Sequence, residues 1–309
     1  MSHTNTTPSQ TTAIRSLSAE VGGVRLRYLS AGDSDGPPVL LWHGFLGTCQ
    51  VWRKVMPLLA DAGYAVLAPD MRGYGDSDKP AGVAGYDARA LAEEFRRLVQ
   101  EIGFGGGRPL ILVGHDMGAP PALLWAAEHP EEIAGVLYAE GPVMLSAVLS
   151  TIIAYTPEAM KEGSMWWWVL PLAPGVPERL VVGHERAFLE WFYDRHTVRR
   201  EAIAAADVDE TLRTFAGREG VLGAMGVYRA AFTSIEQTEP LAGLPGLKVR
   251  VPVVALGGEK GLGERVAAMV KMVASNVEGA VVAGCGHFLP EERPEEVVRH
   301  VKALTAKST

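Results

Sequence analysis

The residues best suited to chemistry lie in the segment 114–118, Gly-His-Asp-Met-Gly, which follows the apolar run 109–112. A buried strand that leads through Gly-x-nucleophile-x-Gly into an apolar helix is the sequence form of a nucleophile elbow. The elbow residue here is Asp116, whose carboxylate cannot act as a serine-type nucleophile but can attack carbon and form an alkyl ester. The alternative is that Asp116 only caps the following helix.

A base and an acid that could serve Asp116 occur later in the chain. An elbow fold places them in the order nucleophile, acid, histidine. His287, in the small-residue turn Gly-Cys-Gly-His at 284–287, is predicted to be the base. Glu140, which follows the strand after the elbow, is the first choice for the acid that orients the imidazole. Glu259, in a glycine-rich turn after a later strand, is the alternative.

Backbone N–H groups beside the nucleophile are predicted to bind a developing oxyanion. The segment 43–45, His-Gly-Phe, matches an oxyanion-hole loop, so the N–H groups of Phe45 and Met117 are expected to converge on one oxygen. His43 is counted among the residues that line the substrate site, although we expect it to hydrogen-bond locally rather than react. The turn 70–77 is interpreted as structural, with internal hydrogen bonds and no chemistry.

Short apolar strands alternate with amphipathic helices through most of the chain, and this alternation must position the reactive segments. The predicted strands are 24–29, 39–42, 65–68, 109–112, 133–139, 251–256 and 280–283. The predicted helices are 52–59, 87–102, 119–128, 264–273 and 294–304. The pattern predicts an α/β fold whose mostly parallel sheet is covered by helices on both faces.

The alternation stops between 142 and 239, where the chain is helical in pattern and rich in aromatic residues. These are Tyr155, Trp166, Trp167, Trp168, Phe188, Trp191, Phe192 and Tyr228. A helical insert between two stretches of one sheet predicts a cap over the strand ends, where open α/β sheets bind ligands. We therefore expect a core of 16–141 and 240–309, a helical cap of 142–239, and a disordered N-terminal tail, 1–15.

Composition excludes several classes of partner. The 309 residues are 48% hydrophobic, enough for a substantial core, and the net charge of −7 argues against nucleic acid or an anionic membrane as a partner. The N-terminal segment lacks an apolar signal core, and no run of 18 apolar residues predicts a bilayer span. Cys49 and Cys285 lack metal-ligand spacing and indicate reduced thiols in the cytoplasm. No metal or cofactor is expected, and the choice between a monomer and a homodimer is left open.

Together these motifs resemble those of α/β-hydrolase-fold epoxide hydrolases and dehalogenases. The resemblance covers roughly 16–306 and rests on the elbow Asp116, the HGF loop, the DxRGxGxS turn, the cap insertion and the GxGHFxPEE ending. Glu140, together with the glycine-rich segment 257–263 that lacks an Asp, is most similar to Cif-type epoxide hydrolases. Two departures stand out: Leu46 replaces the proline of HGxP, and Trp167 occupies the cap position of a ring-binding histidine.

The resemblance implies an enzyme that opens a small-molecule epoxide to a vicinal diol. Family members supply two donors from the cap to the opening ring; Tyr228 resembles the cap tyrosine, and Trp167 or Trp168 offers an indole N–H. The alternative is that these three side chains only fill an apolar cap core. The aromatic, nearly charge-free cap favours an apolar or polycyclic substrate, and its triple Trp resembles tailoring epoxide hydrolases of kinamycin-type aromatic polyketide pathways.

Two other functions are weighed against this one. A dehalogenase would use the same Asp116 on a haloacid or haloalkane. The fluoroacetate-cleaving members carry arginines just after the nucleophile, where this chain has Met117 and Pro120, and haloalkane dehalogenases carry Trp directly after the elbow Asp. A non-catalytic binding protein on the same scaffold is the second alternative, because fold does not fix function. The complete set of Asp116, Glu140 and His287 argues against it.

Overall fold

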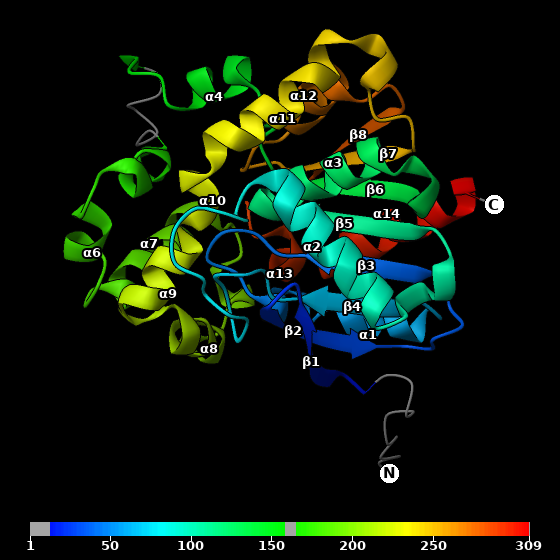
Figure 1. Ribbon diagram of the computed structural model, residues 1–309, viewed down its shortest axis with the longest axis horizontal. Helices are drawn as coiled ribbons and strands as arrows, with labels where there is room; N and C mark the ends of the chain where they lie inside the picture. The colour runs from blue at the N-terminus through cyan, green and yellow to red at the C-terminus, as the bar shows by residue number, and fades with distance from the viewer. Residues whose placement is uncertain (1–12, 158–164, 309) are drawn as a thin grey trace.

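One eight-stranded sheet organises the computed structural model, which describes residues 13–157 and 165–308 (Figure 1). Its strands, in chain order, are β1 (Arg15–Val21), β2 (Val24–Ala31), β3 (Pro38–Trp42), β4 (Ala65–Pro69), β5 (Leu110–His115), β6 (Ile133–Ala139), β7 (Val253–Gly258) and β8 (Val277–Val282). They lie in the order β1-β2-β4-β3-β5-β6-β7-β8. β1 and β2 pair antiparallel, as do β2 and β4, and every later pairing is parallel. The predicted mostly parallel sheet is thereby confirmed.

Helices cover both faces of this sheet. Those that pack beside it are α1 (Val55–Asp61), α2 (Ala88–Glu101), α3 (Ala119–Glu128), α12 (Arg265–Val273), α13 (Leu289–Glu292) and α14 (Pro294–Ser308). Figure 1 shows α2 in front of the sheet and α14 behind it. Because both faces are covered, β3, β4 and β5 are buried along their whole length, as their apolar sequences predict.

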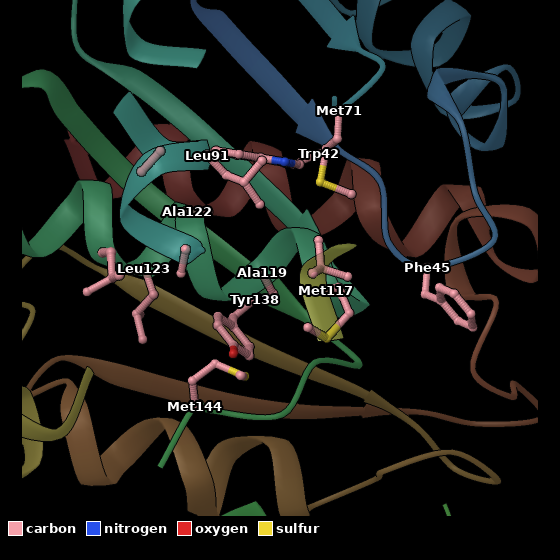
Figure 2. Close-up of a cluster of buried hydrophobic side chains, with 14 of the residues drawn as sticks. Trp42, Phe45, Met71, Leu91, Met117, Ala119, Ala122, Leu123, Tyr138 and Met144 are labelled. Carbon is pink, nitrogen blue, oxygen red and sulfur yellow. The ribbon is translucent and has the colours of Figure 1, made fainter. Parts of the chain in front are cut away.

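Two apolar cores result, one on each face of the sheet. The larger joins α2, α3 and α12 to the sheet and continues into the cap; Figure 2 shows part of it, with Phe45 and Met117 among its members. The smaller lies between the sheet and the pair α1 and α14. The residues that flank the elbow therefore belong to the packed interior, and their backbone positions are set by core packing.

Most of the helices between β6 and β7 lie at the left of Figure 1, beyond one end of the sheet, and α11 (Ala231–Gly243) leads from them back to α12. The others are α4 (Ser146–Ile152), α6 (Val176–Leu180), α7 (Glu185–His196), α8 (Ala205–Phe215), α9 (Gly217–Ala224) and α10 (Gly226–Arg229). Short 3-10 helices are η1 (Cys49–Trp52), η2 (Phe104–Gly107), η3 (Asp116–Gly118), η4 (Pro130–Glu132), η5 (Trp166–Trp168), η6 (Leu170–Leu172), η7 (Arg200–Ala202) and η8 (Pro245–Leu247). We refer to the described part of 142–239 as the cap.

Ion pairs connect this cap to the core. The Arg53 guanidinium, from the core, pairs with Glu291 of α13 at 2.8 Å and with Asp207 of α8.

Helix α11 extends beyond the predicted boundary at 239, because proline removes only its own N–H and the Leu244 N–H still donates to the Pro240 carbonyl at 3.0 Å. The predicted boundary at 239 thus falls inside α11.

Two late strands differ from their predicted bounds. β7 covers 253–258 instead of 251–256, and β8 covers 277–282 instead of 280–283. Gly257 and Gly258 continue β7 because β8 pairs with both, and because the Glu140 carboxylate accepts the Gly258 N–H at 2.7 Å. A glycine pair favours a turn by local propensity, and tertiary pairing overrides that propensity here.

The N-terminal prediction lies mostly outside the described residues. Residues 1–12 of the predicted tail are not described, whereas Arg15 already belongs to β1 and pairs with Ser30. β1 is exposed along most of its length, although Leu17, Ala19 and Val21 alternate with polar residues as in a strand. Within the described ranges, no helix combines the length and the apolar character needed to cross a membrane.

Candidate active site

Asp116 stands at a tight turn between β5 and α3. Its φ of 50° lies in the left-handed region, which residues with side chains rarely adopt. A Cβ at Gly114 would lie 2.5 Å from Ala119 Cα, and one at Gly118 would lie 2.4 Å from the His43 carbonyl oxygen. The turn therefore closes only with glycine two residues before and two residues after Asp116. It presents the carboxylate at the carboxyl end of the sheet.

Two backbone N–H groups hold this carboxylate. The Phe45 N–H donates to Asp116 Oδ2 at 2.9 Å, and the Met117 N–H also hydrogen-bonds the carboxylate. Gly44 permits the close approach of the loop, because a Cβ there would lie 2.7 Å from Oδ2. The structure thus brings together the two N–H groups for which the sequence predicts an oxyanion-binding role.

His287 lies between two carboxylates. From the loop between β8 and α13, its Nδ1 lies 3.2 Å from Glu140 Oε2, and its Nε2 lies 3.9 Å from Asp116 Oδ2. Its backbone N–H donates to the His196 carbonyl at 2.8 Å, and its own carbonyl lies 2.8 Å from His115 Nε2. The loop is held on both sides, so one ring nitrogen faces the acid and the other faces the elbow.

Glu140 is fully buried and is held by backbone donors. Its Oε1 accepts the N–H groups of Gly258 at 2.7 Å and Leu262 at 2.9 Å. A Cβ at Gly261 would lie 2.3 Å from Oε2, so the missing side chain at 261 makes the space that the Glu140 carboxylate occupies. The glycine-rich turn therefore both leaves space for the Glu140 carboxylate and donates hydrogen bonds to it.

The alternative acid points elsewhere. Glu259 is exposed, and its Oε2 accepts the Gly284 N–H at 2.9 Å. Glu140, by contrast, reaches His287 directly. Of the two acids that the sequence offers, the structure brings only Glu140 into hydrogen-bond distance of the histidine ring.

Burial and charge act together on the pKa values of Asp116 and His287. Burial raises the pKa of Asp116, although the His287 charge and the N–H groups of Phe45 and Met117 oppose the rise. Burial lowers the pKa of His287, but the Glu140 hydrogen bond and the charges of Asp116 and Glu140 outweigh it, so that pKa is raised. The protonation of His287 is therefore coupled to the charge on Asp116.

Tyr228, from α10, reaches the elbow from the cap side. Its ring lies edge-on to Phe45, at a centroid distance of 4.8 Å, and to Trp168 at 4.9 Å. Burial and the Asp116 charge raise the pKa of Tyr228 well above its usual value, while a hydrogen bond from the Trp167 side chain opposes the rise. The hydroxyl is therefore protonated at neutral pH and lies close enough to Asp116 to sense its charge.

Tyr228 belongs to a continuous set of rings, which we call the aromatic lining. It consists of Phe45, Trp166, Trp167, Trp168, Phe188, Trp191, Phe192 and Tyr228, with neighbouring centroids 4.8 to 6.5 Å apart. Trp191 is 37% exposed, whereas Trp168 is 7% exposed. The lining therefore runs from the protein surface to the buried elbow.

The histidines near the elbow differ in how they are used. His43 is fully buried; its Nδ1 bonds the Gly44 carbonyl at 2.9 Å and its Nε2 accepts the Met71 N–H at 3.0 Å. Both ring nitrogens are thus bonded within the protein, which agrees with the expectation that His43 hydrogen-bonds locally rather than reacts; its place among the residues that line the substrate site stays a prediction. His196, which the sequence analysis did not single out, lies 6.4 Å from His287, ring to ring. His196 follows Phe192 by four residues, so both lie on one face of α7, and this spacing could have predicted that His196 is near the aromatic residues.

Backbone strain is concentrated at this site. Leu46, Asp116 and Glu140 are the non-glycine residues with positive φ in the described ranges, with values of 56°, 50° and 51°. Each such residue costs roughly 1–3 kcal/mol and persists only where the surrounding structure enforces it. Leu46 stands where the resembled family has proline, whose ring fixes φ near −65°. The oxyanion loop therefore takes a backbone path here that proline could not follow.

Comparisons with known proteins agree with this geometry. Residues 37–162 match the alpha/beta hydrolase fold family. The "Soluble epoxide hydrolase" of Corynebacterium sp. (strain C12) is 30% identical over 298 residues, which cover 93% of this chain and 96% of that protein. The "Fluoroacetate dehalogenase" of Burkholderia sp is 27% identical, with coverages of 91% and 90%. The crystal structure of the Cif epoxide hydrolase from Acinetobacter nosocomialis superposes with a TM-score of 0.85 over 96% of this chain and 90% of that one; at 23% identity this is a likeness of fold.

Proposed function

Because the chain belongs to the α/β-hydrolase-fold family and is a hydrolase of that family, we propose that it opens an epoxide to a vicinal diol through an ester on Asp116. The observation that carries the proposal is the pair of contacts made by His287, at 3.2 Å to Glu140 and at 3.9 Å to an Asp116 oxygen that a backbone N–H already holds. A carboxylate nucleophile, a base and an oriented acid are the set that ester formation and ester hydrolysis require.

The first half-reaction forms the ester. Asp116 Oδ2 is hydrogen-bonded to Phe45, so it becomes the ester carbonyl oxygen, and Oδ1 attacks an epoxide carbon. The carbon–oxygen bond of the ring breaks, and the ring oxygen takes a proton from the Tyr228 hydroxyl. The Tyr228 hydroxyl carries its proton at neutral pH, and ester formation removes the Asp116 charge that helps to raise its pKa, so the proton becomes easier to give as the ring opens. The Trp167 indole N–H, which hydrogen-bonds Tyr228 in the structure, is the second donor near the ring oxygen.

The second half-reaction hydrolyses the ester. His287 Nε2 removes a proton from water, whose oxygen attacks the Asp116 carbonyl carbon. The N–H groups of Phe45 and Met117 bind the resulting oxyanion, whose collapse breaks the ester bond to the substrate oxygen. The leaving alkoxide takes the proton held by His287 and becomes the diol. The proton of the new carboxylic acid passes to the Tyr228 phenolate, which restores the Asp116 carboxylate and the Tyr228 hydroxyl. Esterification removes the Asp116 charge that raises the pKa of His287, so the imidazole is more readily neutral when it must act as a base.

Mass spectrometry of a His287→Gln variant tests this sequence of steps. Alkylation needs no base, so His287→Gln incubated with phenyloxirane should gain the whole mass of the epoxide, on the peptide that contains Asp116. The double variant Asp116→Ala/His287→Gln is the matched control and should gain no mass. An unmodified His287→Gln, seen with an epoxide that the wild type hydrolyses, would overturn the ester mechanism in favour of direct activation of water.

A dehalogenase is the second candidate, supported by the fluoroacetate dehalogenase at 27% identity. The same Asp116 would displace halide from a haloacid, and the cap donors would bind the leaving ion. Met117 and Pro120 stand where the resembled fluoroacetate-cleaving members carry arginine. We therefore expect diol release from epoxides and no halide release from fluoroacetate or chloroacetate; the reverse result would reassign the function.

The aromatic lining supports an apolar, ring-containing substrate. Its rings pack edge to face from the partly exposed Trp191 to the buried Tyr228, and an aromatic ligand can make the same kind of contact with them. A polycyclic substrate of the kinamycin type fits this description and extends the proposal. The two cysteines are both unpaired and buried, which suits the cytoplasm as the compartment.

A further inference from the structure

One face of α7 carries three side chains that point toward the proposed site. Phe188, Phe192 and His196 recur at intervals of four residues and so share a helix face. The Phe192 ring lies 5.7 Å from Phe45 of the oxyanion loop, and the His196 ring lies 6.4 Å from His287. This face therefore runs from the oxyanion loop to the base, and it ends in a polar group.

His196 has an uncommitted nitrogen. Its Nε2 is buried and has no hydrogen-bond partner, whereas both nitrogens of His43 are bonded and His115 Nε2 lies 2.8 Å from the His287 carbonyl. The surroundings of the His196 ring are aromatic, with Trp167 at 5.3 Å and Trp191 at 5.7 Å. A buried polar atom without a partner costs about 1–3 kcal/mol, so a ligand that bonds it recovers that cost.

The imidazole of His196 is neutral at neutral pH. Burial, followed by the charges of His287 and Arg195, lowers its pKa to about 4. A neutral imidazole has one donor nitrogen and one acceptor nitrogen, either of which can bond a hydroxyl, and its N–H can bond a ketone. Its buried, aromatic surroundings disfavour a charged ligand such as a carboxylate or a halide. The chemistry of the side chain therefore selects a neutral, oxygen-bearing ligand.

Backbone contacts hold His196 in place beside the base. Its carbonyl accepts the His287 N–H at 2.8 Å, and a Cβ at Gly286 would lie 2.3 Å from that carbonyl oxygen. The Glu292 carboxylate accepts the N–H groups of Val198 at 2.8 Å and of Gly286 at 3.1 Å, which ties the chain after α7 to the His287 loop. The distance between His196 and the reacting groups is thus set by the fold.

We propose that His196 Nε2 is a polar subsite that hydrogen-bonds a hydroxyl or carbonyl oxygen on an aromatic substrate held by the aromatic lining. This rests on the proposed function for the reacting part of the substrate and adds its class: an aromatic epoxide that carries a neutral oxygen substituent. His196 is the specificity-determining residue, because the surrounding rings of Trp167, Trp191 and Phe192 offer stacking surfaces of low polarity.

Binding of two unreactive probes of similar shape tests the subsite without any turnover. The probes are 2-acetylnaphthalene and 2-isopropylnaphthalene, which differ by a carbonyl oxygen in place of a methyl group. By calorimetric titration the wild type should bind the ketone roughly fivefold to tenfold more tightly than the hydrocarbon, and His196→Phe should erase that preference. His196→Gln, which keeps a donor and an acceptor, should restore part of it. His184→Phe, the same change at the exposed start of α7, is the matched control and should keep the wild-type preference.

Turnover provides the second measurement. We expect the ratio of kcat/KM for acetyl-substituted over isopropyl-substituted phenyloxirane, tested at the meta and para positions, to fall roughly fivefold to tenfold in His196→Phe at one position or both. An equal loss for both substrates would overturn the subsite, because it would show that His196 does not discriminate the oxygen substituent. Equal binding of the two naphthalenes by the wild type would overturn it as well. A wild type that binds the ketone preferentially but hydrolyses no epoxide would contradict the proposed function and leave the subsite standing.

Discussion

The core holds Asp116 and Glu140 through backbone contacts, whereas the cap holds Tyr228 mainly through packed rings. Asp116 and Glu140 have positive φ values and accept hydrogen bonds from main-chain N–H groups, beside glycines that no larger residue could replace. Tyr228 is positioned by rings at 4.8 and 4.9 Å. Main-chain hydrogen bonds are directional and fix an atom's position, whereas contacts between rings depend on shape and on the preferred edge-to-face geometry. The core is therefore suited to bond making, and the cap to choosing what is bound.

The largest effect should follow from removing the nucleophile. Asp116→Ala is expected to abolish turnover, because no other group can form the ester, and to leave the fold intact, because the elbow depends on Gly114 and Gly118. The measurements are diol release and far-UV circular dichroism. Retention of epoxide hydrolysis within about tenfold of wild type would show that the nucleophile is misassigned.

The next largest effect separates the two candidate acids. Glu140→Gln should lose on the order of 10²- to 10⁴-fold in kcat, because the amide no longer orients and stabilises a protonated His287. Glu259→Gln is the matched control, since its carboxylate accepts the Gly284 N–H and does not reach the base; its kcat should be near that of the wild type. The opposite ranking would transfer the role to Glu259.

Changes in the cap should have smaller effects, confined to ring opening. Tyr228→Phe should slow ester formation more than ester hydrolysis, because its proton is needed only when the ring opens. Trp167→Phe should remove one hydrogen bond near a charged oxygen, worth roughly 1.5–3 kcal/mol. Trp168→Phe tests the other indole in the same way. Single-turnover kinetics resolve the two steps, and Tyr64→Phe, whose hydroxyl bonds Thr305 far from the site, serves as the control. Wild-type rates in both tryptophan variants would mean that these indoles only pack.

The smallest expected effect is on stability, and it has a definite sign. Burial raises the folded-state pKa of Asp116 above its unfolded value, so ionisation of this group lowers the stability of the folded protein as pH rises from about 4. Asp116→Asn should therefore have a higher Tm than the wild type at pH 7, by a few degrees, and the difference should shrink toward pH 4. Scanning calorimetry at the two pH values measures it. A lower Tm for Asp116→Asn at pH 7 would show that the charge stabilises the fold.

Much of the core could be predicted from the sequence because its signals are local. The elbow is predicted by five consecutive residues, which include Gly114, Asp116 and Gly118. The alternation of apolar strands and helices predicts the mostly parallel sheet that is observed. The signals fail where a distant partner decides. Gly257 and Gly258 join β7 because β8 and Glu140 pair with them, and nothing in their own sequence favours a strand.

The candidate site divides in the same way. The types of Asp116, Glu140 and His287, and their order along the chain, are properties of the sequence, and they are the basis of the proposed chemistry with a carboxylate nucleophile and a histidine base. The choice between Glu140 and Glu259 needed the tertiary structure, because the empty space at Gly261 determines which carboxylate reaches the imidazole. The buried, unpartnered nitrogen of His196 likewise depends on α7 packing against the His287 loop. Residue types determine which reactions are available, whereas distances between residues far apart in the chain exist only once the chain has folded.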